Sequence, residues 1–424
     1  MSVNLPPSQI TTASNPSSAY VHIPFCRRRC YYCDFPVKVV GDRSSGDNSS
    51  IIAHYIEVLV REIAMTPAPG RSLDTVFFGG GTPSLLSISQ LERILDALDR
   101  QFGIGANAEI SMEMDPGTFD REKLEGVCAA GVNRVSMGVQ AFDDKLLKIC
   151  GRSHLLEDIL AAVESIRQVG VADWSIDLIS GLPKQTLDMW QASLEAAIAI
   201  SPTHISCYDL IVEPKTAFHR YYQAGVSPLP SDETTARMYR LAVEMLAAAG
   251  YEHYEISNYA QSGYQCRHNR VYWENRPYYG FGMGATSYVG GQRFGRPRRS
   301  QDYYQWVETF VAAGGAIDSP PTPADELLEE VLLETLMLGL RLAEGLDLAT
   351  LAQKFGNSIP ERLCKCLEPY RLEGWVEFIE SRHNGSQNNL ENGEFFPCDR
   401  IRLSDPEGFL FSNTIIAALF SEFS

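Results

Sequence analysis

The sequence predicts an α/β protein in which an open three-quarter (β/α)6 barrel is followed by a small helical, winged-helix-like C-terminal domain. Short β-rich apolar runs alternate six times with segments whose apolar residues recur at intervals of three and four, a pattern typical of parallel strands with helices outside. Beyond about residue 305 the pattern changes to consecutive helices followed by short strands. Six strand–helix units are fewer than the eight of a closed barrel, so we expect the barrel to be open.

The six predicted strands cover residues 20–25, 75–78, 108–114, 134–139, 174–179 and 204–210. The amphipathic segments between and after them predict helices at residues 51–65, 89–102, 120–130, 155–169, 187–198 and 233–249. In barrels of this kind, chemistry takes place at the carboxyl ends of the strands. Polar residues at these ends are therefore the candidates for a functional site.

The chain is predicted to divide into a disordered polar tail (residues 1–19), the barrel with a following extension (20–304) and the C-terminal domain (305–424). A Gly/Pro-rich linker is expected around residues 314–323. In the last domain the pattern predicts helices at 326–342, 348–355, 358–372 and 414–420, and a two-stranded element from residues 376–379 and 401–403.

The composition excludes several classes of protein. With 53 acidic and 36 basic side chains the formal charge is −17, which opposes nucleic-acid binding, and the short basic run at residues 293–299 is better interpreted as a solvated loop. No run of about 18 apolar residues is present to span a bilayer. Ten cysteines, three of them within eight positions, do not resemble a secreted disulfide framework, so a cytoplasmic location is expected.

Cys26, Cys30 and Cys33 form a C-x3-C-x2-C pattern at the end of the first predicted strand. Three thiolates suit a [4Fe–4S] cluster in which the fourth iron is open to a non-protein ligand. A zinc site would need a fourth Cys or His, and none lies within the usual local spacing. The alternatives are a zinc site completed from a distant residue and three unrelated core cysteines.

The cysteine pattern and the stretch YVHIPFC at residues 20–26 resemble the radical S-adenosylmethionine (SAM) superfamily. Within it they are similar to the branch that contains oxygen-independent coproporphyrinogen III oxidase and the HemW-type haem chaperones. The resemblance runs from about residue 20 to the C-terminal domain. It implies the open barrel, a [4Fe–4S] cluster, SAM, and an electron donor such as a flavodoxin or ferredoxin.

The resemblance also assigns SAM contacts at the predicted strand ends. The stretch GGGTP resembles the segment that receives the methionine amino group, which would make Gly80, Gly81 and Thr82 contacts. The side chains that the family would use beside the cluster or against the ribose and carboxylate of SAM are Tyr20, Glu113, Gln140, Arg152 and Asp177. Burying such polar groups without partners would cost a few kcal/mol, so a ligand is their natural partner.

Two stretches separate the two members of this branch. The oxidase has another cysteine two positions after the third, whereas this chain has Phe35 there. Residues 266–273 (CRHNRVYW) resemble the H-N-x-x-Y-W sequence associated with haem binding in HemW-type proteins. His268 could then ligate haem iron, with Tyr272 and Trp273 providing flat apolar surface. The alternative is a histidine hydrogen-bonded within a loop, and Cys266 is either a sulfur ligand or a buried thiol.

The sequence thus predicts a radical SAM protein that binds haem and transfers it to haem-requiring acceptor proteins. The resemblance allows peripheral membrane contact and a homodimer. One rival is an oxidase that removes two propionate carboxyl groups of coproporphyrinogen as CO2, and another is a radical SAM enzyme acting on an unrelated small molecule. Three further cysteines show no metal-ligand spacing and receive no assignment: Cys364, Cys366 and Cys398.

Overall fold

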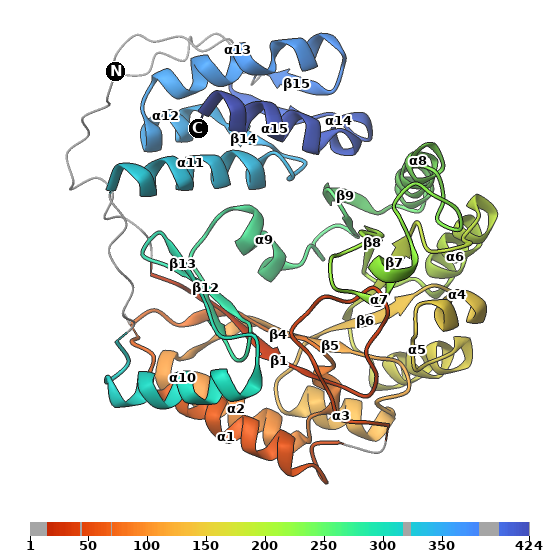
Figure 1. Cartoon of the computed structure of the whole chain (residues 1–424), viewed down its shortest axis with the longest axis vertical. Helices are drawn as coiled ribbons and strands as arrows, with labels where there is room; N and C mark the ends of the chain where they lie inside the picture. Colours follow the sequence, from red (N-terminus) through yellow and green to blue (C-terminus); the bar gives the residue numbers. More distant parts are fainter. Residues whose placement is uncertain (1–14, 43–44, 69, 317–323, 381–397, 424) are drawn as a thin grey trace.

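The computed structural model describes residues 15–42, 45–68, 70–316, 324–380 and 398–423 (Figure 1). The larger part is an α/β barrel, and a separate helical domain lies at the other end of the molecule. Residues 1–14 of the predicted tail and 317–323 of the predicted linker lie outside the described residues.

Six parallel strands form the barrel, and they pair in the order in which they occur in the sequence. They are β1 (Ser18–Ile23), β4 (Leu73–Gly80), β5 (Ile104–Met114), β6 (Arg134–Gln140), β7 (Asp173–Ser180) and β8 (His204–Asp209). The sheet does not close on itself, because β1 and β8 each pair with later strands and not with one another. The predicted open (β/α)6 architecture is confirmed.

All of the helices that cover the sheet except α5 begin at side-chain N-caps, which helps to define where they start. Ser49, Asp120 and Thr186 each accept a hydrogen bond from a backbone N–H of the first turn. The barrel helices are α1 (Ser50–Met65), α2 (Ile88–Phe102), α3 (Arg121–Ala129), α4 (Asp144–Ile149), α5 (Leu156–Val169), α6 (Leu187–Ile200), α7 (Ala217–Tyr221) and α8 (Asp232–Ala248), with a 3-10 turn at Pro83–Leu85.

The extension after α8 returns to both edges of the sheet. On one edge β10 (Asn258–Ala260) pairs antiparallel with β8 and with β9 (Glu252–Glu255), and on the other β11 (Tyr279–Phe281) pairs parallel with β1. The rest of the extension consists of α9 (Arg267–Trp273), β12 (Thr286–Val289), β13 (Gln292–Gly295) and α10 (Ser300–Ala312). The expected boundary between residues 304 and 305 falls inside α10, whose Tyr303 and Val307 belong to the barrel core.

The C-terminal domain has its own hydrophobic core, which includes Leu336, Leu363 and Leu419. Its helices are α11 (Ala324–Gly339), α12 (Leu348–Phe355), α13 (Ser358–Leu372), α14 (Glu407–Leu410) and α15 (Ser412–Phe423). Its sheet has three strands in the order β14 (Leu346–Asp347), β16 (Arg400–Leu403), β15 (Val376–Ile379). The sequence predicted only two of these three strands. It missed β14, because two residues are too few to show the alternating pattern of a strand.

The helix α9 lies between the barrel and α11 of the C-terminal domain (Figure 1). Arg270 of α9 forms an ion pair of 2.9 Å with Glu344. Next to it the backbones of the two parts are joined, because the N–H of Ile256 donates to the carbonyl of Arg341 and that of Ala343 to Tyr254, both at 3.0 Å. The two cores are thus linked through the extension.

Candidate functional site

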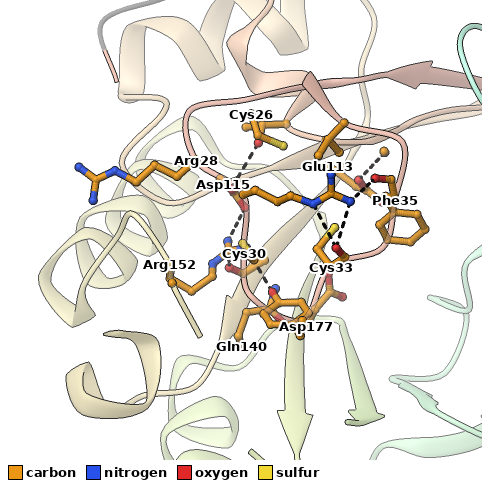
Figure 2. Close-up of a pocket in the computed structure, with 18 of the residues that line it drawn as sticks. Cys26, Arg28, Cys30, Cys33, Phe35, Glu113, Asp115, Gln140, Arg152 and Asp177 are labelled. Carbon is orange, nitrogen blue, oxygen red and sulfur yellow. Dashed lines mark hydrogen bonds and ion pairs between the residues drawn. The ribbon is translucent and has the colours of Figure 1, made fainter. Parts of the chain in front are cut away.

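A cavity of about 450 Å³ opens at the carboxyl ends of the barrel strands. Its walls come from the loop that follows β1 and from the ends of β4, β5, β6, β7 and β8. Figure 2 shows the side chains that surround it, with the three loop cysteines facing the polar groups of the strand ends. The cavity therefore lies where the sequence predicted a site.

The cysteine loop is held in place by short-range contacts. β2 (Phe25–Cys26) pairs with β3 (Lys38–Val39), which returns the chain beside its own start. Within the loop the N–H of Cys33 donates to the carbonyl of Cys30 at 3.3 Å, and Arg29 donates to the carbonyl oxygens of Cys33 and Phe35. These contacts place all three thiols at the cavity wall.

The three thiols fit a cluster better than a single ion. They are unbridged, partly exposed, and line one cavity. Within the described part of the chain, no three His, Cys, Asp or Glu side chains converge as ligands of one metal ion would. A [4Fe–4S] cluster instead needs each thiolate on a different iron. Burial raises the pKa of Cys26 to about 12 and that of Cys33 to about 11, so iron binding must displace their protons.

Two glycines let the end of β4 approach this loop closely. A Cβ on Gly81 would lie 2.7 Å from the carbonyl oxygen of Phe25 and 3.0 Å from the sulfur of Cys26. Gly80 has a φ of +115°, and a Cβ there would collide with the ring of His22. Both glycines line the cavity beside Thr82. Because they have no side chain, a ligand in the cavity could approach their backbone closely.

Glu113 and Asp177 carry carboxyl groups with raised pKa values. Burial raises the pKa of Glu113 to about 8, assisted by the charge of Asp177 and opposed by a 3.0 Å hydrogen bond from the N–H of Gly80. Burial likewise raises the pKa of Asp177 to about 6. At neutral pH Glu113 is therefore mostly protonated until a cationic ligand group arrives.

Arg152 connects the polar wall to the cysteine loop. Its guanidinium pairs with Asp115 at 2.6 Å and donates to the carbonyl of Gly138 at 2.9 Å. Another of its nitrogens lies 3.4 Å from the sulfur of Cys30. Asp115 was not assigned a role from the sequence, although its alternation with Glu113 on β5 places both side chains toward the cavity.

Gln140 ends β6 with a φ of +67°, an uncommon conformation for a residue other than glycine. The pairing of β6 with β7 shifts register between Met137 and Gln140. The irregular strand end leaves the Gln140 side chain at the cavity wall, as the sequence predicted. Such local strain is typical of functional sites.

Tyr20 lies beneath the cavity and is not among the residues that line it. Its hydroxyl is 3.0 Å from Nδ1 of His22, and its ring stacks on that of Phe77. A Cβ on Gly79 would touch both the Tyr20 ring and a carboxylate oxygen of Glu113. Tyr20 thus supports the site from below.

His268 does not line the cavity and packs against β4, where its ring stacks on that of Phe77. It is fully buried, with Nδ1 2.7 Å from the hydroxyl of Thr75 and Nε2 2.9 Å from that of Tyr272. The backbone N–H of His268 donates to Glu109, at the start of α9. No ring nitrogen is free in this arrangement, so the expected haem ligation would require α9 to leave the barrel. Cys266 is also fully buried and caps α9 as a thiol.

Exposed apolar side chains stand among the charged residues at the cavity opening, and the sequence analysis did not predict this apolar rim. Phe35 and Ile211 are 57% and 67% exposed, and both line the opening together with Tyr208. Apolar side chains are rarely left exposed together at a cavity mouth without a ligand or partner. The sequence singled out Phe35 alone, because Tyr208 and Ile211 join it at the cavity only in the fold.

Two family models match the chain: the radical SAM superfamily over residues 20–197 and the HemN C-terminal domain over residues 327–383. A heme chaperone HemW of Synechocystis is 47% identical over 96% of this chain and 97% of its own length. The heme chaperone HemW of Bacillus subtilis is 37% identical over 86% of this chain and 93% of its own length. A mitochondrial radical S-adenosyl methionine domain-containing protein 1 of Danio rerio is 32% identical over 81% of this chain and 78% of its own.

Among solved structures, coproporphyrinogen III oxidase (HemN) from Escherichia coli superposes with a TM-score of 0.75 at 23% identity. The superposition covers 97% of this chain and 92% of that one, so the two share the fold from the barrel through the C-terminal domain. None of the helices in the described part of the chain combines the length and apolar character needed to cross a membrane.

Proposed function

Because this chain belongs to the HemW family of haem chaperones within the radical SAM superfamily, we propose that it binds haem and transfers it to haem-requiring acceptor proteins. The observation that carries the proposal is the pairing of an unbridged three-cysteine loop with Phe35, in a chain 47% identical to a HemW protein over nearly its whole length. The oxidase branch would have a further cysteine in place of Phe35.

Cys26, Cys30 and Cys33 would hold a [4Fe–4S] cluster, and SAM would bind beside it. The residues that would contact SAM line the same cavity: Gly80, Gly81, Thr82, Glu113, Gln140, Arg152 and Asp177. When bound, the cluster and SAM supply one-electron chemistry at the carbon–sulfur bonds of SAM.

The chain's own residues prepare the cavity for these charged groups. Glu113 can release its proton to accept a hydrogen bond from an ammonium group, since its pKa is raised to about 8 in the ligand-free chain. Arg152 places a guanidinium nitrogen 3.4 Å from the Cys30 sulfur. Its own position is fixed by Asp115. The protein thus orients the ligands and excludes water around them.

Haem could meet the chain at two places. The apolar rim formed by Phe35, Tyr208 and Ile211 offers exposed flat surface at the cavity mouth. The stretch at α9 carries His268, whose use as an iron ligand requires α9 to open. The proposal also includes an electron donor such as a flavodoxin or ferredoxin, a homodimer and peripheral membrane contact.

The test is an anaerobic haem titration of the cluster-loaded chain, followed by the Soret band, with transfer to an apo-acceptor as a second readout. We expect saturable binding. If His268 ligates the iron, His268→Ala weakens binding, whereas Tyr272→Phe, which frees Nε2, leaves it equal or tighter.

Equal weakening by both substitutions would mean that α9 matters only for structure and would direct attention to the rim. Absence of saturable binding would refute the carrier function. Release of CO2 from coproporphyrinogen would then establish the oxidase alternative.

A further inference from the structure

Two cysteines that received no assignment from the sequence approach one another in the C-terminal domain. Cys364 lies on α13, which packs against β15. Cys398 comes just before β16, and the N–H of the next residue, Asp399, donates to the carbonyl of Ile379 at the end of β15. The strand pairing therefore brings Cys398 beside Glu380, and Cys364 reaches the same residue from the helix.

The two thiols are in hydrogen-bonding contact. The hydrogen bond from Cys398 lowers the pKa of Cys364, and the same contact raises the pKa of Cys398. Cys364 is the member of the pair that lines a surface cavity, so its thiolate would be the attacking group in reactions with peroxides and disulfides. The neighbouring protonated thiol is then placed to resolve the product.

Small molecules can reach Cys364 from the surface. Cys364 lines a cavity of about 550 Å³ on the surface of the C-terminal domain, together with Lys365 and Arg371. Cys366, two residues further along α13, does not line the cavity, and burial raises its pKa.

We propose that Cys364 and Cys398 form a reversible disulfide when the protein meets hydrogen peroxide. The Cys364 thiolate attacks one peroxide oxygen, the O–O bond breaks, and hydroxide leaves, which takes up a proton to give water. Cys364 is then a sulfenic acid. The Cys398 thiol attacks its sulfur, the S–O bond breaks and a second water leaves. Two thiols are oxidised to one disulfide, and one peroxide is reduced to two waters.

The bond would join the middle of α13 to Cys398, two positions before β16. Both thiols belong to the core of the C-terminal domain, where α13 packs against β15, the strand that pairs with β16. The reaction lies far along the chain from the cysteine loop and uses none of its thiols. Its success or failure is therefore independent of haem carriage.

The test uses the full-length chain with its cluster reconstituted. After a brief anaerobic exposure to hydrogen peroxide, free thiols are blocked, and the chain is digested without reductant and examined by mass spectrometry. We expect a linked peptide pair containing Cys364 and Cys398, lighter than the two free peptides by two hydrogen atoms. Dithiothreitol should restore both thiols.

Three variants make the result decisive. Cys398→Ser should abolish the linked pair and leave a sulfenic acid at Cys364 that dimedone captures, while Cys366→Ser should leave the linked pair unchanged. A Cys364–Cys366 link, a link between chains, or peroxide-treated chains in which Cys364 and Cys398 both stay alkylatable would overturn the proposal. Because the linked peptide is sought first in the unsubstituted chain, Cys398→Ala serves as a second variant should Cys398→Ser fold poorly.

Discussion

The polar wall of the cavity is formed by individual side chains near the ends of the barrel strands. Three of its predicted residues could be found from the sequence because a polar residue at the end of an apolar strand is conspicuous, as at Glu113, Gln140 and Asp177. Asp115 follows the same alternation and pairs with Arg152, yet its partner lies 37 positions away in the sequence. Pairings of this kind depend on the tertiary fold and leave no local signal.

Gly81→Ala should impair cluster retention, because the new Cβ would lie 2.7 Å from the carbonyl of Phe25 and 3.0 Å from the sulfur of Cys26. We expect a several-fold loss of iron and acid-labile sulfide per reconstituted chain. Gly295→Ala is the matched control, since its Cβ meets only the hydroxyl of Thr286 at an ordinary 3.5 Å. Equal iron content in both variants would contradict the close approach.

Binding of SAM should release a proton from Glu113. The carboxyl group has a pKa of about 8 in the ligand-free chain, so it is mostly protonated at pH 7, and a cationic ligand group would displace the proton. Calorimetry in buffers of different protonation enthalpy should give nearly one proton released at pH 7 and fewer as pH rises through 8.

Glu113→Gln should abolish that release and weaken SAM binding by about tenfold to a hundredfold, the worth of one hydrogen bond to a charged group. Asp209→Asn, at the edge of the same cavity, is the control and should leave proton release unchanged. Proton release that survives Glu113→Gln would assign the proton to another group.

At the scale of elements, the six barrel strands were predictable because each is a short β-rich stretch between helical segments, and β6 and β8 begin at the residues expected. The helix α4 was missed because six residues are too few to show a period. The strands β9, β10 and β11 were missed because three or four residues gain strand structure only by pairing with a long neighbour. The buried ion pair that holds the extension against the barrel could not be predicted from the sequence either.

That group is the ion pair of Arg296, in the loop before α10, with Glu62 of α1, at 2.8 Å and nearly without exposure. Glu62 also accepts hydrogen bonds from the N–H of Gly282 and the hydroxyl of Tyr303. Arg296→Ala should lower the free energy of unfolding by about 3–5 kcal/mol, because it leaves a buried carboxylate without its counter-ion. Urea denaturation measures the loss.

Arg100→Ala provides the comparison, because Arg100 faces Asp96 at 3.6 Å on an exposed surface. Its free energy of unfolding should be nearly that of the native sequence. Similar losses in the two variants would show that the buried pair contributes no more than a surface contact.

Over the whole molecule, buried groups of opposite type set the pH at which the ligand-free chain is most stable. Burial raises the pKa values of Glu113 to about 8, Glu255 to about 7, and Asp177 and Asp209 to about 6. A carboxyl group with a raised pKa favours the folded state at low pH, and this contribution is lost as pH rises through the folded value. Burial lowers the pKa values of buried histidines, which act in the opposite direction.

The buried histidines contribute to the stability of the folded chain above pH 6.5. This contribution is lost as the pH falls from 6.5 toward their folded pKa values, which are about 4 for His22 and His154 and about 3 for His268. Stability should therefore peak near pH 6 and decline toward pH 8, where only the carboxyl groups titrate. Thermal unfolding should show a melting temperature several degrees lower at pH 8 than at pH 6.

High salt should preserve most of this decline, because buried charges are screened much less than surface ones. Glu113→Gln should reduce it. A melting temperature that stays constant or rises between pH 6 and pH 8 would contradict this explanation. It would show that burial does not disfavour the ionised form of these carboxyl groups in the folded chain.

The pairing of β11 with β1 also has a consequence for the order of events during synthesis. β1 leaves the ribosome early, but its outer edge gains its hydrogen bonds only when residues 279–281 have been translated. The hydroxyl of Tyr55 then bridges the carbonyl of His22 and the N–H of Met283, which supports the strand end that leads into the cysteine loop. Until about two thirds of the chain has emerged, this loop lacks its final support. A newly made chain therefore becomes competent to receive iron late in translation, however early its cysteines appear.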